Sequence, residues 1–480
     1  MNRDFVLIYL NGKRLEIRGR DCFLMMSDYL RYQKQMTGTK VVCAEGDCGA
    51  CTCLRFSPLS AEQRFVSFNS CIMPVALLDG SHIITVEGIA EDSGLNPIQK
   101  AMVECNGSQC GFCTPGFVMS YCDLFERKPG KLQQTITEKN IKNALTGNLC
   151  RCTGYQSIID AGSKIKKLAT VSDRYRNPKI ESELSSHLKK SVYIKHEDLI
   201  FYAPTTVKAA TAFKAKNKNA MVFSAATDLG VPINKGKLKP KALLSLNLIA
   251  DLYKSKFSKT TKSYMIGAKV TLTEIENTLG PQIPEFEKLL QVFASPQIKN
   301  SATLAGNVAN GSPIGDTLPF LSVIGAWVHL QGQSSKRKIA FNKFYKGYRK
   351  PDIKTDEIIT AIEIPIPEPE EILRLYKVSQ RKDLDISVVS AGIRTVIKEN
   401  KIIEFKFSLG GVAETVKPLP LTEKFLTQKL ISDETIQKAC QVLSKEIKPL
   451  SDLRGQSDYR NKLSQNFLIK FFKEIEHDRI

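Results

Sequence analysis

Long apolar segments are missing from this sequence of 480 residues. The strongest apolar run, FLSVIGAWVHL at 320–330, is too short to cross a lipid bilayer as a helix. The first residues, MNRDFVLIYLNGKRLEI, alternate apolar and polar side chains and lack the apolar core and cleavage site of a signal peptide. We therefore predict a cytoplasmic protein without a membrane span.

Acidic residues are scarce relative to basic ones, with 49 Asp and Glu against 69 Lys and Arg, a net charge of +20. The lysines concentrate at 164–218 and 235–262. Nucleic-acid binding is disfavoured, because no patch of interleaved basic and aromatic residues accompanies the charge. A solvated lysine surface remains as an interpretation, as does attraction of an acidic partner or an anionic cofactor.

Cysteine is almost absent after residue 152, where Cys440 alone follows twelve earlier cysteines. The total of 13 is odd, and a reducing cytosol argues against a disulfide framework. The first third of the chain is therefore expected to carry thiolate chemistry, and the remainder to do something else.

The segment CAEGDCGACTC at 43–53 places three cysteines at the spacing C-x4-C-x2-C, with Cys71 twenty residues further on. This is the spacing of plant-type [2Fe–2S] ligands. The cluster needs four converging thiolates, and a loop that wraps it requires the backbone freedom that Gly46 and Gly49 provide. The spacing therefore indicates Cys43, Cys48, Cys51 and Cys71 as ligands.

Zinc is the main alternative at this site. Zinc sites usually pair C-x2-C with a second C-x2-C or with histidine, and His82 is the first histidine of the chain. Cys53 is interpreted as an inward-facing strand residue and Cys22 as a core residue. Cys105 and Cys122 fall on predicted helices and are expected to be core or half-buried.

A second set consists of Cys110 and Cys113 in QCGFCTPG, followed by Cys150 and Cys152 in NLCRCTGY. This combination is less specific, and zinc would compete if the site stood alone. Two such turns, placed between helices after a plant-type loop, can hold a second [2Fe–2S] cluster.

Five segments are predicted from composition and periodicity. They are a small α+β domain at 1–88, a helical domain at 89–170, a lysine- and serine-rich linker at 171–199, a mixed α/β domain at 200–370, and a domain of strands and then helices at 371–480. Within them we expect a helix at 23–35 and small-residue loops at 224–230 and 302–316. The fold class is multidomain α+β.

Three long motifs, CAEGDCGACT, SQCGFCTPGF and GNLCRCTGYQSI, occur in this order and closely resemble the iron–sulfur part of the xanthine dehydrogenase family of molybdenum hydroxylases. The resemblance implies a β-grasp ferredoxin-like domain that holds one [2Fe–2S] cluster, followed by a four-helix domain that holds another. It assigns the first four ligand cysteines to the former cluster and Cys110, Cys113, Cys150 and Cys152 to the latter.

The middle third has no G-x-G-x-x-G motif, so a Rossmann site is unsupported. Its loops SAATDLG and ATLAGNVANGSPIGD instead resemble the FAD domain of the same family, of the vanillyl-alcohol-oxidase-like type, and FYKGYRK also matches that domain. The tail resembles the small C-terminal domain of these flavoproteins. The implied flavin-binding residues are Val222, Phe223, Ser224, Ala225, Ala226, Thr227, Asp228, Leu229, Phe293, Thr303, Gly306, Asn307, Asp316, Ile359 and Lys377. The family commonly has glycine where this chain has Ala225 and Ala226, a departure that could weaken FAD binding.

Over nearly its whole length the chain resembles the small subunit of two-chain bacterial members of this family. The resemblance implies electron transfer from a large molybdenum-cofactor subunit, which oxidises a purine, through both clusters to FAD and on to NAD⁺. It also implies a dimer of heterodimers, and we expect no catalytic residue in this chain. The alternatives are the same role in an oxidoreductase for aldehydes or N-heterocycles, and a non-catalytic iron–sulfur assembly or regulatory protein.

Overall fold

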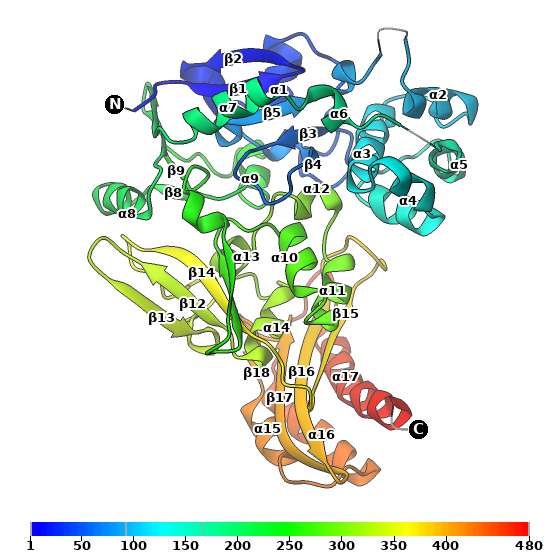
Figure 1. Cartoon of the computed structure of the whole chain (residues 1–480). Helices are drawn as coiled ribbons and strands as arrows, with labels where there is room; N and C mark the ends of the chain where they lie inside the picture. The colour runs from blue at the N-terminus through cyan, green and yellow to red at the C-terminus, as the bar shows by residue number, and fades with distance from the viewer. Residues whose placement is uncertain (1, 92–93, 167, 479–480) are drawn as a thin grey trace. The chain divides into compact units, whose positions relative to one another are not determined.

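The computed structural model describes residues 2–91, 94–166 and 168–478 (Figure 1). The chain forms two compact units. The first comprises 1–253, 271–274 and 295–303, and the second comprises 254–270, 275–294 and 304–480. None of the helices in the described ranges is long and apolar enough to span a membrane.

The first unit begins with a five-stranded sheet in the order β2-β1-β5-β3-β4. Strands β1 and β5 run parallel, and the other neighbours are antiparallel. A tight turn at Asn11 and Gly12, both with positive φ, joins β1 to β2 as the LNGK sequence predicts. The strands are β1 (Val6–Leu10), β2 (Lys13–Ile17), β3 (Thr52–Phe56), β4 (Val66–Asn69) and β5 (Ser81–Ile84).

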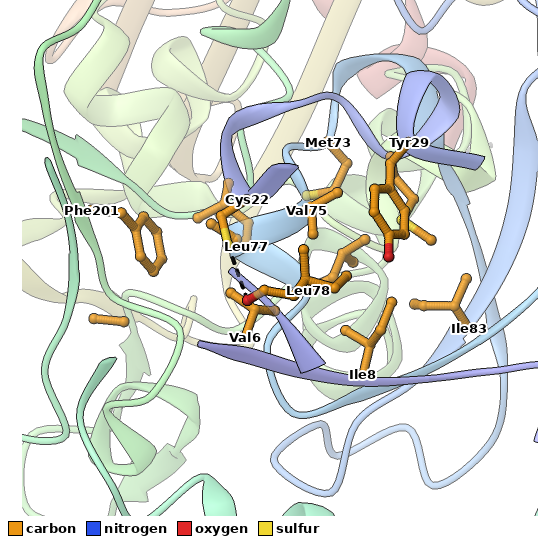
Figure 2. Packing of buried hydrophobic residues seen from close by; sticks show 14 of the residues in the cluster. Val6, Ile8, Cys22, Tyr29, Met73, Val75, Leu77, Leu78, Ile83 and Phe201 are labelled. Carbon is orange, nitrogen blue, oxygen red and sulfur yellow. Dashed lines mark hydrogen bonds between the residues drawn. The ribbon is translucent and has the colours of Figure 1, made fainter. Parts of the chain in front are cut away.

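A closely packed apolar cluster lies against this sheet (Figure 2). Val6 and Ile8 point into it from β1, and Phe201 enters it from a later strand. The helix expected at 23–35 is shorter than predicted, with α1 (Met26–Asp28) continuing as the π-helical turn η2 (Tyr29–Gln33). The remaining short helical turns of this domain are η1 (Gly19–Phe23), η3 (Ser70–Ile72), η4 (Val75–Leu78) and η5 (Val86–Gly88).

Four helices follow, as expected from the change in periodicity near residue 89. Asn96 caps the first of them, and Thr137 caps the third in the TITEKN segment that predicts a capping signal. Their apolar faces share one core with part of the first sheet. The elements are α2 (Pro97–Glu104), α3 (Thr114–Arg127), η6 (Gly130–Thr135), α4 (Glu138–Leu145) and α5 (Gln156–Lys164).

The segment 171–199 is not an irregular linker, and that prediction is wrong. It contains α6 (Val171–Tyr175), α7 (Pro178–His187) and the start of a sheet. Leu184 of α7 is fully buried and packs against two side chains of β1. The lysine-rich flanks hide the short apolar spacing from Ile180 to Leu184, which gives α7 one buried face.

A second sheet in the first unit has the order β6-β7-β9-β8. The parallel pairing of β7 and β8 with β9 places α8 in a β–α–β connection. The elements are β6 (Val192–His196), β7 (Leu199–Ala203), α8 (Val207–Lys216), β8 (Met221–Phe223), α9 (Gly230–Asn234), β9 (Ala242–Ser245), η7 (Ala250–Tyr253) and the later α12 (Pro296–Lys299).

The second unit contains a five-stranded antiparallel sheet in the order β10-β11-β14-β12-β13. The loop predicted at 302–316 is wrong over part of its length, because Leu304–Asn310 forms α13. Alanine, leucine and valine outweigh the single Gly306 in that stretch and favour a helix. The strands are β10 (Ser255–Ser258), β11 (Ser263–Gly267), β12 (Trp327–Gln331), β13 (Lys336–Ala340) and β14 (Ile358–Pro365). The helical elements nearby in sequence are α10 (Leu272–Leu279), α11 (Pro284–Gln291), α14 (Thr317–Ile324) and η8 (Phe341–Lys343).

The C-terminal part is a four-stranded sheet, β15 to β18 in sequence order, packed with helices. The turn at KENK has positive φ at Glu399 and Asn400, which confirms the predicted hairpin. The helical ending of the chain is also confirmed. The elements are β15 (Glu371–Val378), β16 (Val389–Lys398), β17 (Lys401–Gly410), β18 (Lys417–Pro418), α15 (Pro420–Leu426), α16 (Asp433–Glu446) and α17 (Ser457–Asp478).

Candidate cluster and flavin sites

The first set of four cysteines comes together in the first unit. Cys51 and Cys71 are buried, and their sulfur atoms lie 3.2 Å apart. Cys43 is hydrogen-bonded to both Cys48 and Cys71, which links all four thiols. These hydrogen bonds hold the pKa of Cys43 well below its usual range and raise the pKa of Cys48, its donor. The pKa is lowered for two of the four thiols and raised for the two that donate to them, and a thiophilic metal group would have to displace the protons that remain.

Polar donors surround these sulfur atoms. The backbone N–H of Glu45 donates to the Cys43 sulfur at 3.4 Å, and the Asn69 amide donates to the Cys51 sulfur at 3.8 Å. The loop reaches this arrangement through positive φ angles at Gly46 and Gly49. Hydrogen bonds to thiolate sulfurs are a feature of iron–sulfur sites, so the residues present fit a [2Fe–2S] group.

Two nearby cysteines are separate from this set, as predicted. Cys53 lies in β3 with its side chain in the apolar core, and Cys22 lies in the same core. Burial raises the pKa of each thiol to about 12. These two residues are protonated core side chains at neutral pH.

The second set of cysteines also comes together, at the starts of two helices. Cys113 immediately precedes α3, and Cys152 lies four residues before α5. The sulfur atoms of Cys152 and Cys110 lie 3.6 Å apart, and Cys113 is hydrogen-bonded to Cys150. Cys110 and Cys152 are exposed. This second group of four also fits a [2Fe–2S] cluster, at the protein surface.

Hydrogen bonds connect the thiols of the first set in a chain of four and those of the second set in two pairs. Within 2–91, 94–166 and 168–478, no group of three or more His, Cys, Asp or Glu side chains is arranged to hold a single metal ion.

The two cysteine loops are in direct contact. The backbone N–H of Leu149 donates to the carbonyl oxygen of Cys48 at 3.0 Å, and Leu149 is covalently joined to Cys150. Gly49 and Gly116 allow this approach, because a Cβ on Gly116 would lie 2.2 Å from the Gly49 carbonyl oxygen. One hydrogen bond thus connects a residue of the first set to the backbone that carries the second.

Helix α9, which follows the loop at 224–229, lies against the first cysteine set. The Asn234 side-chain amide donates to the carbonyl oxygens of Ala44 at 2.8 Å and Cys71 at 2.7 Å. Lys235 forms an ion pair with Glu45, and a Cβ on Gly230 would lie 2.4 Å from the Ile72 carbonyl oxygen. The predicted flavin loop is therefore connected through one short helix to the first cysteine set.

The first part of the predicted flavin site lies in the first unit. Val222 and Phe223 belong to β8, residues 224–229 form the expected loop, and the Ser224 hydroxyl lies 3.4 Å from that of Thr303. Ala226 has a φ of 57°, a left-handed conformation that favours glycine. The buried methyl group of Ala226 joins the core of Figure 2, which is why this strained residue is tolerated.

The other predicted flavin residues belong to the second unit. Asp316 and Lys377 form a buried ion pair of 2.8 Å, although 61 residues separate them. Ser387 donates to Asp316, and Lys377 donates to the Val292 carbonyl oxygen. Burial raises the pKa of Asp316, and the Lys377 ammonium opposes this shift. The remaining members are Gly306 and Asn307 on α13, half-buried Phe293 after α11, and buried Ile359 on β14.

Three family models match successive parts of the chain. A "[2Fe-2S] binding domain" matches residues 85–163, a "FAD binding domain in molybdopterin dehydrogenase" matches 194–367, and a "CO dehydrogenase flavoprotein C-terminal domain" matches 374–475. The chain is related to the molybdenum hydroxylases. Its matched parts are similar to the [2Fe–2S], FAD-binding and flavoprotein C-terminal domains that these models describe, in a multidomain α+β fold.

The chain is also similar to individual molybdenum hydroxylases. Xanthine dehydrogenase from Emericella nidulans is 30% identical across 98% of this chain and 39% of that protein. Aldehyde oxidase 1 from Bos taurus is 29% identical across the same shares. A chain of the reconstituted CO dehydrogenase from Oligotropha carboxidovorans has a TM-score of 0.53 and 26% identity, over 56% of this chain and 94% of that chain. The chain thus spans about two fifths of the length of the curated relatives it matches.

Sequence reasoning missed the residues that connect these sites. Asn148, Asn234 and Ser387 carry no motif of their own, and each acts through a partner that is distant in the sequence. Asn148 lies two residues before Cys150, and this position is the one available signal.

Proposed function

We propose that this chain is the electron-transfer part of a molybdenum hydroxylase. In the proposal, Cys43, Cys48, Cys51 and Cys71 hold one [2Fe–2S] cluster, and Cys110, Cys113, Cys150 and Cys152 hold another. When bound, the clusters supply one-electron steps and FAD connects these with two-electron chemistry. The gathering of eight cysteines into two groups of four, joined by the Leu149–Cys48 hydrogen bond, is the observation that carries the proposal.

The burial of the two sets supports an order for the electron path. Cys110 and Cys152 are exposed, which suits exchange with a redox centre outside this chain. Cys51 and Cys71 of the first set are buried, and Cys71 contacts α9, which continues from the predicted diphosphate loop. Electrons would enter at the helical domain, cross to the ferredoxin-like domain, and leave toward the flavin.

Two groups of residues, one in each unit, are proposed to contact FAD. The loop at 224–229, with Thr303, would receive the diphosphate through backbone N–H groups. In the second unit, the buried Asp316–Lys377 pair would offer polar groups to the cofactor. Ala226 adopts a left-handed conformation that glycine adopts without strain, so we expect FAD to bind less tightly than with glycine there.

We further propose that a large partner subunit carries the molybdenum cofactor, that a purine is the substrate and that NAD⁺ is the acceptor. Kinship with xanthine dehydrogenases supports the substrate. Aldehyde oxidase 1 matches almost as well, so oxidation of aldehydes is the second candidate. The +20 net charge suits an acidic partner or an anionic acceptor.

The metal and flavin content of the purified chain tests the central proposal. We expect iron and sulfide for two [2Fe–2S] clusters, one FAD per chain, and two distinguishable signals by electron paramagnetic resonance (EPR) after reduction. NADH should reduce a dye through the flavin, whereas xanthine should not without the partner. Zinc in place of iron, or a flavin-free chain from a flavin-replete preparation, would contradict the proposal.

The substrate and acceptor need a separate experiment. The chain should be purified with its native partners, and the complex should be assayed with hypoxanthine, xanthine and an aromatic aldehyde against NAD⁺ and oxygen. Purine turnover with NAD⁺ supports the first candidate, and aldehyde turnover alone supports the second. A complex with neither activity would favour an assembly or regulatory role.

A further inference from the structure

Gln297 lies at the point where three parts of the first unit meet. It belongs to α12, within the range that matches the FAD-binding domain model. Its side-chain amide nitrogen lies 3.3 Å from the Thr52 hydroxyl, 3.1 Å from the Ser120 hydroxyl and 3.0 Å from the Asn148 side-chain oxygen. All four side chains are almost completely buried. A single amide thus contacts β3, α3 and the loop before Cys150.

These contacts lead directly to both cysteine loops. Thr52 donates to the Gly49 carbonyl oxygen at 2.6 Å, and Asn148 donates to the same oxygen at 3.3 Å. Gly49 lies between Cys48 and Cys51, and Asn148 lies two residues before Cys150. Gln297 therefore contacts both side chains that donate to Gly49, at the point where the two cysteine loops touch.

Packing and hydrogen bonding do not by themselves require a glutamine here. Among the described residues, the Gln297 side-chain oxygen has no hydrogen-bond partner although it is buried, an arrangement that costs stability. Each of its three partners has another hydrogen bond: Thr52 with Gly49, and Ser120 with Asn148 at 2.7 Å. Removing the Gln297 amide would leave none of these groups unpaired.

The chain also keeps space for this side chain. A Cβ on Gly147 would lie 2.1 Å from the Gln297 side-chain oxygen. The Gln297 amide therefore fits only because residue 147 is glycine. A role of the Gln297 amide in positioning the two cysteine loops would explain two features. One is the glycine at position 147, and the other is the burial of the Gln297 amide despite its unpaired oxygen.

We propose that Gln297 is a positioning residue that fixes the two cluster-binding loops relative to each other, and so sets the electronic contact between the clusters. The inference rests on the proposed function. It assigns to the flavin-binding part a role in the iron–sulfur relay, through a side chain that touches no ligand cysteine. No cluster ligand changes when Gln297 is replaced.

The test compares Gln297→Leu with the wild-type chain, both loaded with clusters. Leucine has nearly the same volume and removes the unpaired oxygen, so we expect the melting temperature to stay within a few degrees of the wild-type value. EPR of the fully reduced protein should show a changed or lost magnetic splitting between the clusters. Electron equilibration between them, followed after flash reduction, should be slower.

Further variants separate positioning from packing. Gln291→Leu on α11 is the control for the substitution itself, because Gln291 is exposed and its amide bonds only to Glu287 among the described residues. Gln297→Met supplies a second apolar side chain if leucine prevents folding. Ser120→Ala combined with Gln297→Leu leaves the Asn148 oxygen without a donor, so the double variant should exceed the sum of the single effects.

The outcomes distinguish the inference from the proposed function. A lower melting temperature of Gln297→Leu with unchanged splitting and unchanged equilibration would show a packing role and overturn the inference. A wild-type chain that lacks the two EPR signals would overturn the proposed function first. The inference and the proposed function are both supported if the wild-type chain shows the two EPR signals, Gln297→Leu alters their splitting, and Gln291→Leu leaves the splitting unchanged.

Discussion

The two cysteine sets use the same residue type in opposite surroundings. Cys51 and Cys71 of the first set are 1% and 2% exposed and pack against Ile72, whereas Cys110 and Cys152 of the second set are exposed. The first set is held by contacts from β4, α9 and the loop before Cys150. We infer that a cluster that exchanges electrons only within the chain needs a loop held by several neighbouring segments. A cluster that exchanges electrons with a partner needs ligands exposed at the surface.

Glycine substitution should show this difference most strongly. Gly49 and Gly154 both have left-handed backbone, but a Cβ on Gly49 would lie 2.2 Å from the Gly147 carbonyl oxygen, whereas a Cβ on Gly154 would meet nothing within 4 Å. We expect Gly49→Ala to cost about 3 kcal/mol or more and to lose the first cluster, and Gly154→Ala to cost about 1 kcal/mol. Chemical unfolding and iron content measure both, and equal costs would contradict the comparison.

Acid should destabilise the domain of the first set through His82. This buried side chain accepts a hydrogen bond from the Gly12 N–H and lies among the rings of Tyr9, Phe65 and Tyr175. Burial lowers its pKa to about 4 from 6.5, despite the opposing charge of Glu181. The neutral form is favoured in the folded state, so stability present above pH 6.5 falls by roughly 3 kcal/mol as the pH drops toward 4.

Denaturant unfolding between about pH 7 and pH 4 measures this loss. His82→Gln keeps an acceptor for the Gly12 N–H but does not titrate, so its stability should depend less on pH. His477→Gln is the control, because His477 is exposed near the end of α17. An acid slope that is the same in His82→Gln and wild type would show that other groups cause the loss.

Removing the Asn234 side chain of α9 should affect the first cysteine set alone. Asn234→Ala loses the two hydrogen bonds to the carbonyl oxygens of Ala44 and Cys71, at a cost of about 1–2 kcal/mol. The EPR signal of the first cluster should shift while that of the second stays unchanged. The exposed Asn219→Ala is the matched control. A shift of both signals would mean that the Asn234 side chain acts on the whole unit.

The smallest effect is expected at the flavin loop. Ala226→Gly relieves a left-handed alanine but loses a buried methyl group, for a net gain of at most about 1 kcal/mol. If the strain opposes the bound loop, the FAD dissociation constant falls by up to about fivefold. Ala225→Gly is the control, because Ala225 has no positive φ. Weaker FAD binding by Ala226→Gly would show that the methyl group supports the site.

Local patterns were sufficient where one segment contains its own signal. The Asn11–Gly12 turn, the Thr137 cap and the KENK hairpin were all predicted, because turn and cap chemistry acts over a few residues. The helices in 171–199 escape prediction because their apolar spacing is short and is surrounded by lysines. The helix within 302–316 escapes prediction because small residues are compatible with both loop and helix.

The sequence by itself indicated the first set of thiols through their spacing, and its motifs indicated the second set and the family through a resemblance. Three features appear only in the tertiary structure: the burial of two cysteines in one set against the exposure of two in the other, the contact between Leu149 and Cys48, and the convergence on Gln297. These contacts join residues up to 245 positions apart. No local pattern encodes them, because they depend on the packing of surfaces that different segments contribute.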